Sequence, residues 1–232
     1  MMTVGELGEA ALVRAILERI SDASGDILVP AGDDGAVVVT GPATVVTLDT
    51  ITAGLDYLPT HTPPMAIGHR VVAVNLSDLA AMGATPTWLV FGAEFDSAMD
   101  AEAAMAVVDG AVALARRFGA IIVGGDVGIR PGPTALTVCA LGAPGAKTLR
   151  RSNARPGDDV WLIGELGLAS IGLAILRSNT PTEPWHAYAV SKHLWPEPQV
   201  WAGKALAALD ARIAAIDVSD GLGIDAARLA AA

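Results

Sequence analysis

A helix with a polar pair in its second half constrains the fold of this chain most. From Pro64 to Gly83, apolar residues repeat at helical spacing, and Gly83 supplies a C-terminal stop. Asn75 and Asp78 are three residues apart, so both project from the same face of this helix. Burying a carboxylate among apolar side chains costs several kcal/mol unless it is paired or bound to a cation. The helix therefore presents Asp78 either to solvent or to a bound partner.

Apolar runs of strand and helix type alternate along the 232 residues, which favours an α/β fold. Helices are expected at residues 5–20, 64–82, 100–118, 169–177, 200–209 and 222–232. Strands are expected at residues 37–39, 44–48, 88–95, 120–123, 134–142, 160–163 and 213–216. The proline-punctuated segment 179–198 is expected to be a loop.

A Gly/Pro-containing stretch at residues 143–159 predicts a boundary between two units, residues 1–147 and residues 148–232. The second unit has only about two expected strands, too few to form a sheet of its own. We therefore expect an N-terminal domain with a mixed sheet and helices, followed by an incomplete α/β C-terminal domain. This pattern favours a fragment of a longer protein.

Composition excludes several classes of protein. The formal net charge of −10 argues against a nucleic-acid backbone as partner. Hydrophobic residues make up 52% of the chain, but charges and prolines interrupt the long apolar runs, so no membrane span is expected. The N-terminus lacks the basic and apolar regions of a secretory signal, and Cys139 is the single cysteine, so a cytoplasmic protein is expected.

Four aspartates share one sequence context, because each closes or adjoins an apolar run of strand type beside Gly, Ser or Thr. They are Asp34, Asp49, Asp126 and Asp217. Strand ends position ligands well, and Mg²⁺ prefers carboxylate oxygens while keeping water and substrate phosphate in its shell. Converging carboxylates with metal can clamp a triphosphate and neutralise charge on a transferring phosphoryl group. Alternatively, each aspartate is a turn residue or a helix N-cap.

Other catalytic arrangements find little support. The chain has no GxxxxGK[ST] motif, which excludes a P-loop nucleotide site. The four histidines show no metal-ligand spacing, and Ser219 has no evident base partner for nucleophilic catalysis. Glycines before Asp126 allow a backbone to approach phosphate closely. The aspartates therefore remain the main candidates for chemistry.

The order of the motifs resembles that of the thiamine-monophosphate kinase family, in the aminoimidazole ribonucleotide synthetase superfamily. The matching stretches are Gly5-Glu6, Gly32-Asp33-Asp34, Asp49-Thr50, residues 75–84, Gly124-Gly125-Asp126, Arg151-Ser152, residues 156–158, 172–176 and 193–196, and residues 217–222. They span essentially the whole chain in the same order. The resemblance implies a PurM-like N-terminal domain that dimerises, its strands joining those of a second copy in a barrel.

The resemblance also implies ATP-dependent phosphorylation of thiamine monophosphate to thiamine diphosphate with several Mg²⁺ ions. Side chains matching the family's metal ligands are Asp34, Asp49, Asp78, Asp126, Asp217 and Asp220. Residues matching its nucleotide site are Thr47, Gly125, Asp126, Arg151 and Ser219. No residue is assigned an acid, base or nucleophile role beyond positioning metal and phosphate.

The chain departs from the family pattern at three places. Leu48 stands where the family usually has Thr, and Asp56 stands where it usually has a substrate-side His, so Asp56 is the predicted substrate contact. The family's Gly-Gly-Glu-Asp-type motif and closing aromatic residue are absent from the 232 residues. Two alternatives stay open: a catalytically impaired fragment that binds nucleotide or dimerises, and an ATP-dependent synthetase of the same fold.

Overall fold

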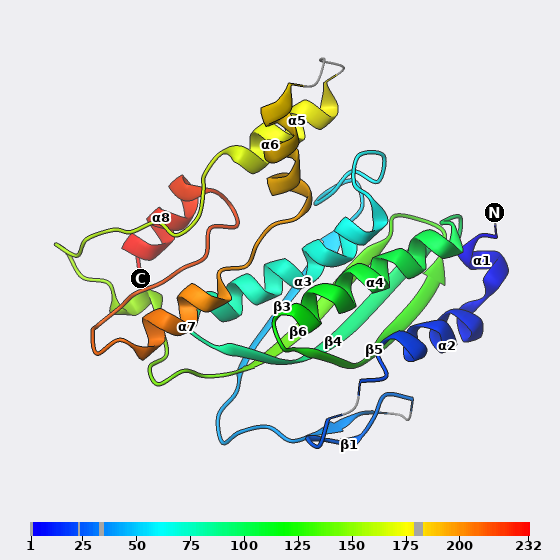
Figure 1. Ribbon diagram of the computed structural model, residues 1–232, viewed down its shortest axis with the longest axis horizontal. Coiled ribbons are helices and arrows are strands. Elements are labelled where there is room, and N and C mark those ends of the chain that lie inside the picture. Colours follow the sequence, from blue (N-terminus) through cyan, green and yellow to red (C-terminus); the bar gives the residue numbers. More distant parts are fainter. Residues whose placement is uncertain (1, 23, 33–34, 179–182) are drawn as a thin grey trace.

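The computed structural model describes residues 2–22, 24–32, 35–178 and 183–232, and a four-stranded mixed sheet organises it (Figure 1). Across the sheet the order is β3-β6-β4-β5, so β3 and β5 are its two edges. Strand β6 is antiparallel to both of its neighbours, whereas β4 and β5 are parallel. The strands are β3 (Val45–Thr52), β4 (Thr85–Asp96), β5 (Ile121–Arg130) and β6 (Ala135–Ala143).

One extra residue interrupts the pairing of β4 with β5. Leu89 pairs with Ile122, but the next residue of β4, Val90, pairs with Gly124. Val123 is thus the inserted residue of a β-bulge, which shifts the alternation of side chains along the rest of β5. After the bulge, Asp126 pairs with Gly92.

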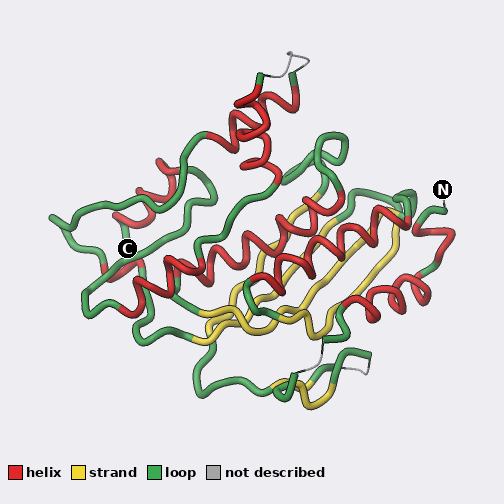
Figure 2. Tube along the Cα trace, in the orientation of Figure 1, coloured by secondary structure: helices red, strands yellow, loops and turns green. Residues whose placement is uncertain are grey.

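Two long helices, α3 (Pro64–Ala81) and α4 (Ala101–Arg117), cover one face of the sheet (Figures 1 and 2). They pack closely because glycines face the opposing backbone. A Cβ added at Gly68 would lie 1.7 Å from the carbonyl oxygen of Val107, and one at Gly110 would lie 2.0 Å from that of Met65. The helices and the inner sheet face share one continuous core, which is why both helices are so rich in buried apolar residues.

The N-terminal elements pack beside this layer. They are α1 (Val4–Leu7), α2 (Glu9–Arg19) and a small antiparallel pair, β1 (Ile27–Val29) and β2 (Val37–Val38). The expectation of one helix over residues 5–20 is wrong in detail. Gly8 has φ +79°, a conformation open to glycine but unfavourable for other residues, and it separates α1 from α2.

The C-terminal part contains helices and extended segments. The helices are the short 3₁₀ helix η1 (Arg151–Asn153), α5 (Leu168–Arg177), α6 (Pro184–Leu194), α7 (Val200–Ala208) and α8 (Leu222–Ala230). The expected strands at residues 160–163 and 213–216 are not formed, because neither extended segment has a strand to pair with among the residues that the structure describes. The expected loop 179–198 is also wrong, because it contains α6, which begins with Pro184 at its first position.

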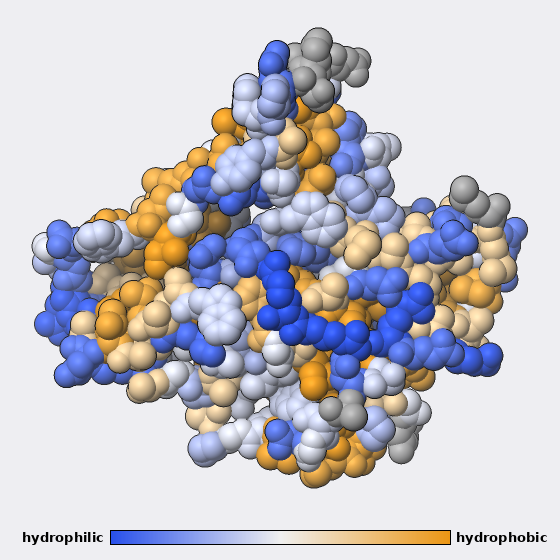
Figure 3. Space-filling view, viewed as in Figure 1, coloured by the Kyte–Doolittle hydropathy of each residue, from blue (hydrophilic) through white to orange (hydrophobic). Residues whose placement is uncertain are grey.

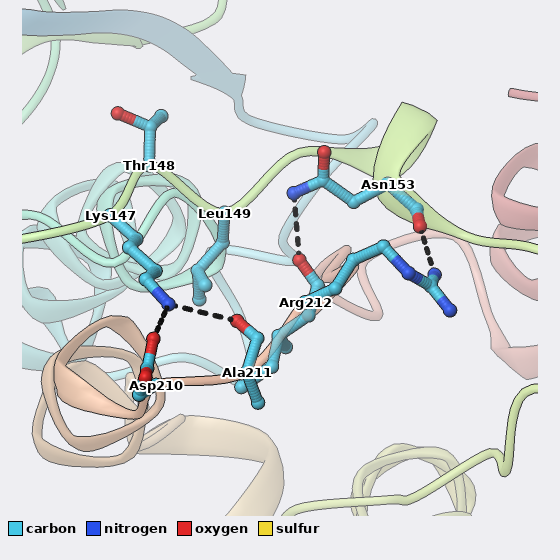
Figure 4. A pocket seen from close by; sticks show the side chains of 8 residues that line it. Lys147, Thr148, Leu149, Asn153, Asp210, Ala211 and Arg212 are labelled. Carbon is cyan, nitrogen blue, oxygen red and sulfur yellow. Dashed lines mark hydrogen bonds and ion pairs between the residues drawn. The ribbon is translucent and has the colours of Figure 1, made fainter.

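A few contacts join the C-terminal part to the helical layer. Helix α7 lies against α3 so closely that a Cβ added at Gly203 would be 2.1 Å from the Ala80 carbonyl oxygen. On the other half of α3, His69 Nε2 lies 2.8 Å from the Pro196 carbonyl oxygen. Figure 4 shows a pocket of about 360 Å³ between residues 147–153 and residues 210–213, where Lys147 donates to Asp210 at 2.8 Å.

The other expected helices, β4 and β6 are confirmed within a few residues of their expected ends, whereas β3 and β5 run farther than expected, β5 as far as Arg130. The α/β class and the mixed sheet are confirmed as well. The division at residue 147 stays a prediction. Over the described ranges, no helix is both long and apolar enough to cross a lipid bilayer.

Candidate functional site

The second half of α3 presents its polar pair to the edge strand β3. Asn75 is fully buried, and its Oδ1 accepts a hydrogen bond from the backbone N–H of Asp49 at 3.1 Å. The amide Nδ2 of Asn75 donates to the Val71 carbonyl oxygen, one turn earlier, at 2.8 Å. Asn75 thereby satisfies its own buried polar atoms, and its bond to Asp49 fixes the position of β3 along the helix.

Asp78 meets the inner face of the same strand. Thr47 and Asp49 are two residues apart, so both point towards α3, while Leu48 points away. Thr47 Oγ1 donates a hydrogen bond to Asp78 Oδ2 at 2.5 Å. The carboxyl groups of Asp49 and Asp78 also lie within hydrogen-bonding reach of each other. A neutral donor and two carboxyl groups therefore converge between α3 and β3.

The loop before α8 adds a third carboxylate. Asp217 lies close enough to the Ser77 side chain of α3 for that polar group to lower its pKa, and it is within electrostatic range of Asp78 and of the exposed Arg151. Residues far apart in the sequence therefore meet over one helix. Ser219 lies exposed in the same loop.

The electrostatics of this group favour a bound cation. Burial raises the pKa of Asp49, and the neighbouring charges of Asp78, Asp217 and Asp220 raise it further. Burial also raises the pKa of Asp217, with the charge of Asp78 as the next cause, while Ser77 and Arg151 oppose the shift. Carboxyl groups this close require a shared proton or a cation to relieve their repulsion.

The side chains of the described residues alone do not complete a metal cage here. Within the described ranges, no group of three or more His, Cys, Asp or Glu side chains has an arrangement that could hold a metal ion. Mg²⁺ commonly binds one or two carboxylates and takes its other ligands from water and substrate phosphates. Asp49 and Asp78, with Asp217 beside them, fit such a shared shell.

Asp220, also predicted as a ligand, is engaged elsewhere. Its carboxylate pairs with Arg228 at 2.5 Å, and its backbone N–H donates to Asp225 at 3.0 Å. Arg228 also pairs with the buried Asp225 at 2.8 Å. In this arrangement Asp220 belongs to the cap of α8, although its charge still reaches Asp49.

The structure does not bring Asp126 to the other predicted ligands. Because of the bulge at Val123, Asp126 lies on the sheet face opposite α3 and α4, in register with Gly92. Farther along β5, Arg130 pairs with Glu94 of β4 at 3.0 Å on this outer face. Asp126 is exposed, and among the described residues no side chain or backbone group forms a hydrogen bond or ion pair with its carboxylate.

The remaining predicted residues are Asp34, Asp56 and Gly125. Asp34 lies outside the described residues. Asp56 follows β3 in a tight turn, where its carboxylate accepts the Thr52 N–H at 2.7 Å. Gly125 has a structural requirement of its own, because an added Cβ would lie 1.8 Å from the Phe91 carbonyl oxygen.

The expectation that the aspartates sit at strand ends is wrong for two of them. Asp49 lies inside β3 and Asp126 inside β5, while Asp217 follows an extended segment that is not part of a sheet. No site role is predicted from the sequence for Asn75, which positions the Asp49 backbone, or for Ser77, which lies beside Asp217. Their position in the same turns of the helix as Asp78 could have indicated that they lie at the site.

Comparison with known proteins identifies the family. Residues 32–143 match the family described as AIR synthase related protein, N-terminal domain. Over 93% of this chain, the thiamine-monophosphate kinase of Salmonella typhimurium is 34% identical, and that of Mycobacterium tuberculosis is 35% identical over 99%. This chain covers 66% of the first relative and 68% of the second. The chain belongs to the thiamine-monophosphate kinase family.

Solved structures of thiamine-monophosphate kinases share the fold. The crystal structure of the Stenotrophomonas maltophilia K279a kinase is 36% identical with a TM-score of 0.81, and the match covers 95% of this chain and 70% of that one. A structure described as AaThiL complexed with AMPPCP and TMP is 26% identical with a TM-score of 0.74, and the match covers 100% and 72%. The chain thus spans about two thirds of the length of its kinase relatives.

Proposed function

We propose that this chain is an ATP- and Mg²⁺-dependent kinase that phosphorylates thiamine monophosphate to thiamine diphosphate. The observation that carries the proposal is the convergence of Asp49, Asp78 and Asp217 with Thr47 between α3, β3 and the loop before α8. Family membership supports ATP as phosphoryl donor and thiamine monophosphate as acceptor, since an ATP analogue and TMP are both named in the complex of a family member.

The residues of this site would position the reaction. Asp49 and Asp78 would hold Mg²⁺, with Asp217 close by, and Arg151 would approach phosphate near Asp217. Bound Mg²⁺ would neutralise the phosphate oxygens and the charge that develops during in-line transfer. Asn75 would keep the Asp49 backbone in place, and Thr47 would orient Asp78 through its hydroxyl. Asp34, Gly125, Ser219 and the substrate contact Asp56 stay as proposed members of the site.

We also propose that the chain forms a homodimer in the cytoplasm and has no nucleic-acid or membrane partner. The face of the sheet opposite α3 and α4 has no covering layer among the described residues, and it exposes apolar side chains from the edge and the centre. Val46 and Leu48 are each 61% exposed, and Val90 is 40% exposed. A second copy of the sheet would cover this face.

The test is chromatographic detection of thiamine diphosphate after incubation with thiamine monophosphate, ATP and Mg²⁺. We expect product from the wild-type chain and a loss of at least about 100-fold for Asp78→Asn, since this change removes a preorganised charge. The matched control is Asp109→Asn, because Asp109 pairs with Arg19 on the surface, away from the site.

Two other outcomes would overturn the kinase assignment. Phosphate release without a phosphorylated thiamine would indicate the synthetase alternative. A dimer whose melting temperature does not respond to Mg·ATP would indicate the inert fragment, since a ligand of the native state raises its stability.

A further inference from the structure

One sequence motif, residues 193–196, has no part in the site described above. The structure places it at the end of α6 and just beyond, against the first half of α3. His69 of α3 donates to the Pro196 carbonyl oxygen at 2.8 Å, and its ring meets that of Trp195 in a T-shaped arrangement at 5.2 Å. The motif therefore attaches the C-terminal part to α3 more than two turns before Asp78.

Arg70, the next residue of α3, also contacts this motif. Its Nη2 donates to the His193 carbonyl oxygen at 2.5 Å and lies 3.3 Å from Nε2 of the His193 ring. Its Nη1 donates instead to the Asp56 carbonyl oxygen at 3.0 Å. A guanidinium group holds its donors in a rigid fork, so these bonds fix the two carbonyl groups relative to each other. Arg70 thus joins α6 to the turn that carries Asp56.

Little packing holds the tip of that turn in place. Tyr57 at its end is buried, but Leu55 at its tip is 84% exposed, and Asp56 is exposed as well. The hydrogen bond from the Thr52 N–H to the Asp56 carboxylate is local, so it sets the shape of the turn and not its place against the helices. The bond from Arg70 reaches the turn from another element and supplies that placement.

Stability alone does not explain a guanidinium group at this position. Burial lowers the pKa of Arg70, while the nearby charge of Asp56 opposes that shift. The Nε of Arg70 is buried without a hydrogen-bond partner among the residues that the structure describes. A buried cation with an unpaired donor lowers stability, and local conflicts of this kind are expected at functional positions. The two donors that do find partners are therefore the reason for an arginine here.

Helix α3 holds this turn and the carboxylate cluster at a fixed separation. Arg70 and Asp78 are eight residues apart on the helix, which is about 12 Å. Strand β3 spans a similar distance, since Asp49 and Thr52 at its end are about 10 Å apart. Asn75 bonds the backbone of β3 at one place, and Arg70 bonds the turn beyond its end. Phosphoryl transfer requires donor and acceptor to be held in line, and these two bonds provide such a frame.

We propose that Arg70 is a positioning residue for the phosphoryl acceptor, because it holds the turn at residues 54–57 so that Asp56 faces the substrate. The proposal rests on the proposed function, in which Asp56 is the substrate contact. Arg70 acts through the backbone of this turn and does not itself contact the substrate. Loss of Arg70 therefore weakens binding of thiamine monophosphate and leaves binding of Mg·ATP at Asp49 and Asp78 intact.

Steady-state kinetics of Arg70→Met test this role, since methionine removes every donor and keeps a side chain of similar length. A turn that takes its binding-competent position a tenth of the time weakens apparent affinity about 10-fold. We expect the KM for thiamine monophosphate to rise by about 10-fold or more, and the KM for ATP and kcat to change by less than about 3-fold. Arg70→Lys keeps a cation with three donors and should restore most of the affinity. A lysine variant as impaired as Arg70→Met would count against the proposal.

The matched control is His69→Leu. His69 attaches the same motif to the same helix, but its hydrogen bond goes to Pro196 and not to the turn. We expect this variant to loosen the attachment of α6 without raising the KM for thiamine monophosphate. Equal increases of that KM in His69→Leu and Arg70→Met would mean that the junction as a whole matters, and the proposal would be overturned. An unchanged KM in Arg70→Met would overturn it as well.

Hydrogen exchange without ligand separates this proposal from the proposed function. The amides of residues 54–57 should exchange at least about 10-fold faster in Arg70→Met than in wild type or His69→Leu. Equal exchange in all three chains would overturn the proposal, whatever the activity of the enzyme. If the wild-type chain makes no thiamine diphosphate but the exchange difference is present, the kinase assignment fails and the positioning of the turn by Arg70 stands.

The same exchange data show whether each variant is folded. Slow exchange of β4 and β6 marks a folded chain, because both strands lie inside the sheet. If Arg70→Met does not fold, Arg70→Gln takes its place in every comparison, since glutamine keeps one polar donor group. The expected order of the turn's exchange rates is then wild type, Arg70→Lys and Arg70→Gln, from slowest to fastest, and any other order would overturn the proposal.

Discussion

The two parts of the chain use apolar residues differently. In residues 4–149 the sheet and helices bury them, and Leu76, Leu89 and Phe95 have no exposed surface. In residues 150–232 many large apolar side chains face outward, including Trp161 at 86% and Val160 at 84% exposure. Figure 3 shows apolar surface beside α8, where the extended segment 160–163 runs.

The difference shows where stability and site geometry originate. A shared core fixes α3 and β3, so Asp49, Asp78 and Asn75 are held rigidly. The loop of Asp217 belongs to the part with little core, and it reaches α3 through Ser77. The site therefore combines a rigid side with an adaptable one, as ligand-binding regions often do.

The largest expected effect is that of Gly68→Ala in the N-terminal part. Its Cβ would overlap the Val107 carbonyl oxygen, so α3 and α4 must separate. We expect a loss of about 3 kcal/mol or more in the free energy of unfolding, measured by urea denaturation. The control is Gly223→Ala in α8, where the Cβ meets nothing within 4 Å. Equal losses for both variants would contradict the comparison.

Gly203→Ala tests the junction between the two parts. The new Cβ would push α7 away from the Ala80 carbonyl oxygen of α3, at a cost of about 1–3 kcal/mol. We expect limited proteolysis to cut the C-terminal part earlier while hydrogen exchange of β4 and β6 stays slow. Faster exchange throughout the sheet would show that the two parts unfold as one unit.

Asp49→Asn tests whether the carboxylate repulsion on the rigid side of the site lowers the stability of the fold. Because the pKa of Asp49 is raised, its native state holds a proton above the ordinary value of 3.8, and stability falls as pH rises through that window. Without ligand at pH 7, the variant should be more stable than wild type by less than about 1 kcal/mol, because solvent around this partly exposed carboxyl screens the repulsion. Thermal melts from pH 3 to pH 8 should show the difference vanishing below pH 3.8, where both states are protonated.

The same variant should lose the stabilisation that Mg·ATP gives to wild type, since it lacks one carboxylate of the proposed site. A variant less stable than wild type at pH 7 without ligand would mean that the Asp49 carboxylate is satisfied within the fold. Asp109→Asn serves as control, because that carboxylate forms a surface ion pair with Arg19.

The smallest expected effect is that of Trp161→Ser. With 86% of its surface exposed, the side chain has little packing to lose, so the free energy of unfolding should change by less than about 0.5 kcal/mol. Urea denaturation measures this change. A loss comparable to that of Gly68→Ala would mean that Trp161 is covered in solution by another surface.

The sequence predicted the fold best where periodicity and local chemistry agree. Helix α3 and its stop at Gly83 could be read directly, as could β4, α4 and β6. Helix α6 is not predicted from the sequence because prolines surround it, although none of them lies in its interior. The strands expected at 160–163 and 213–216 have strand-like composition, but a strand also needs a neighbour, and composition does not supply one.

The sequence predicted which residues belong to the site, but not how they are arranged. The aspartates could be selected from their sequence context, and Asp49, Asp78 and Asp217 do meet. Pairing of Asp220 with Arg228 depends on the turn before α8, which a motif does not reveal. The position of Asp126 depends on one unpaired residue in β5.

That inserted residue has a consequence for sequence change in this family. Successive side chains of a strand point to opposite faces of the sheet. The extra residue Val123 reverses which face each side chain of β5 takes from Gly124 onward. Removing one codon at this point would keep the Gly-Gly-Asp motif intact in any sequence alignment. It would nevertheless turn the Asp126 carboxylate under α4, into the apolar interior.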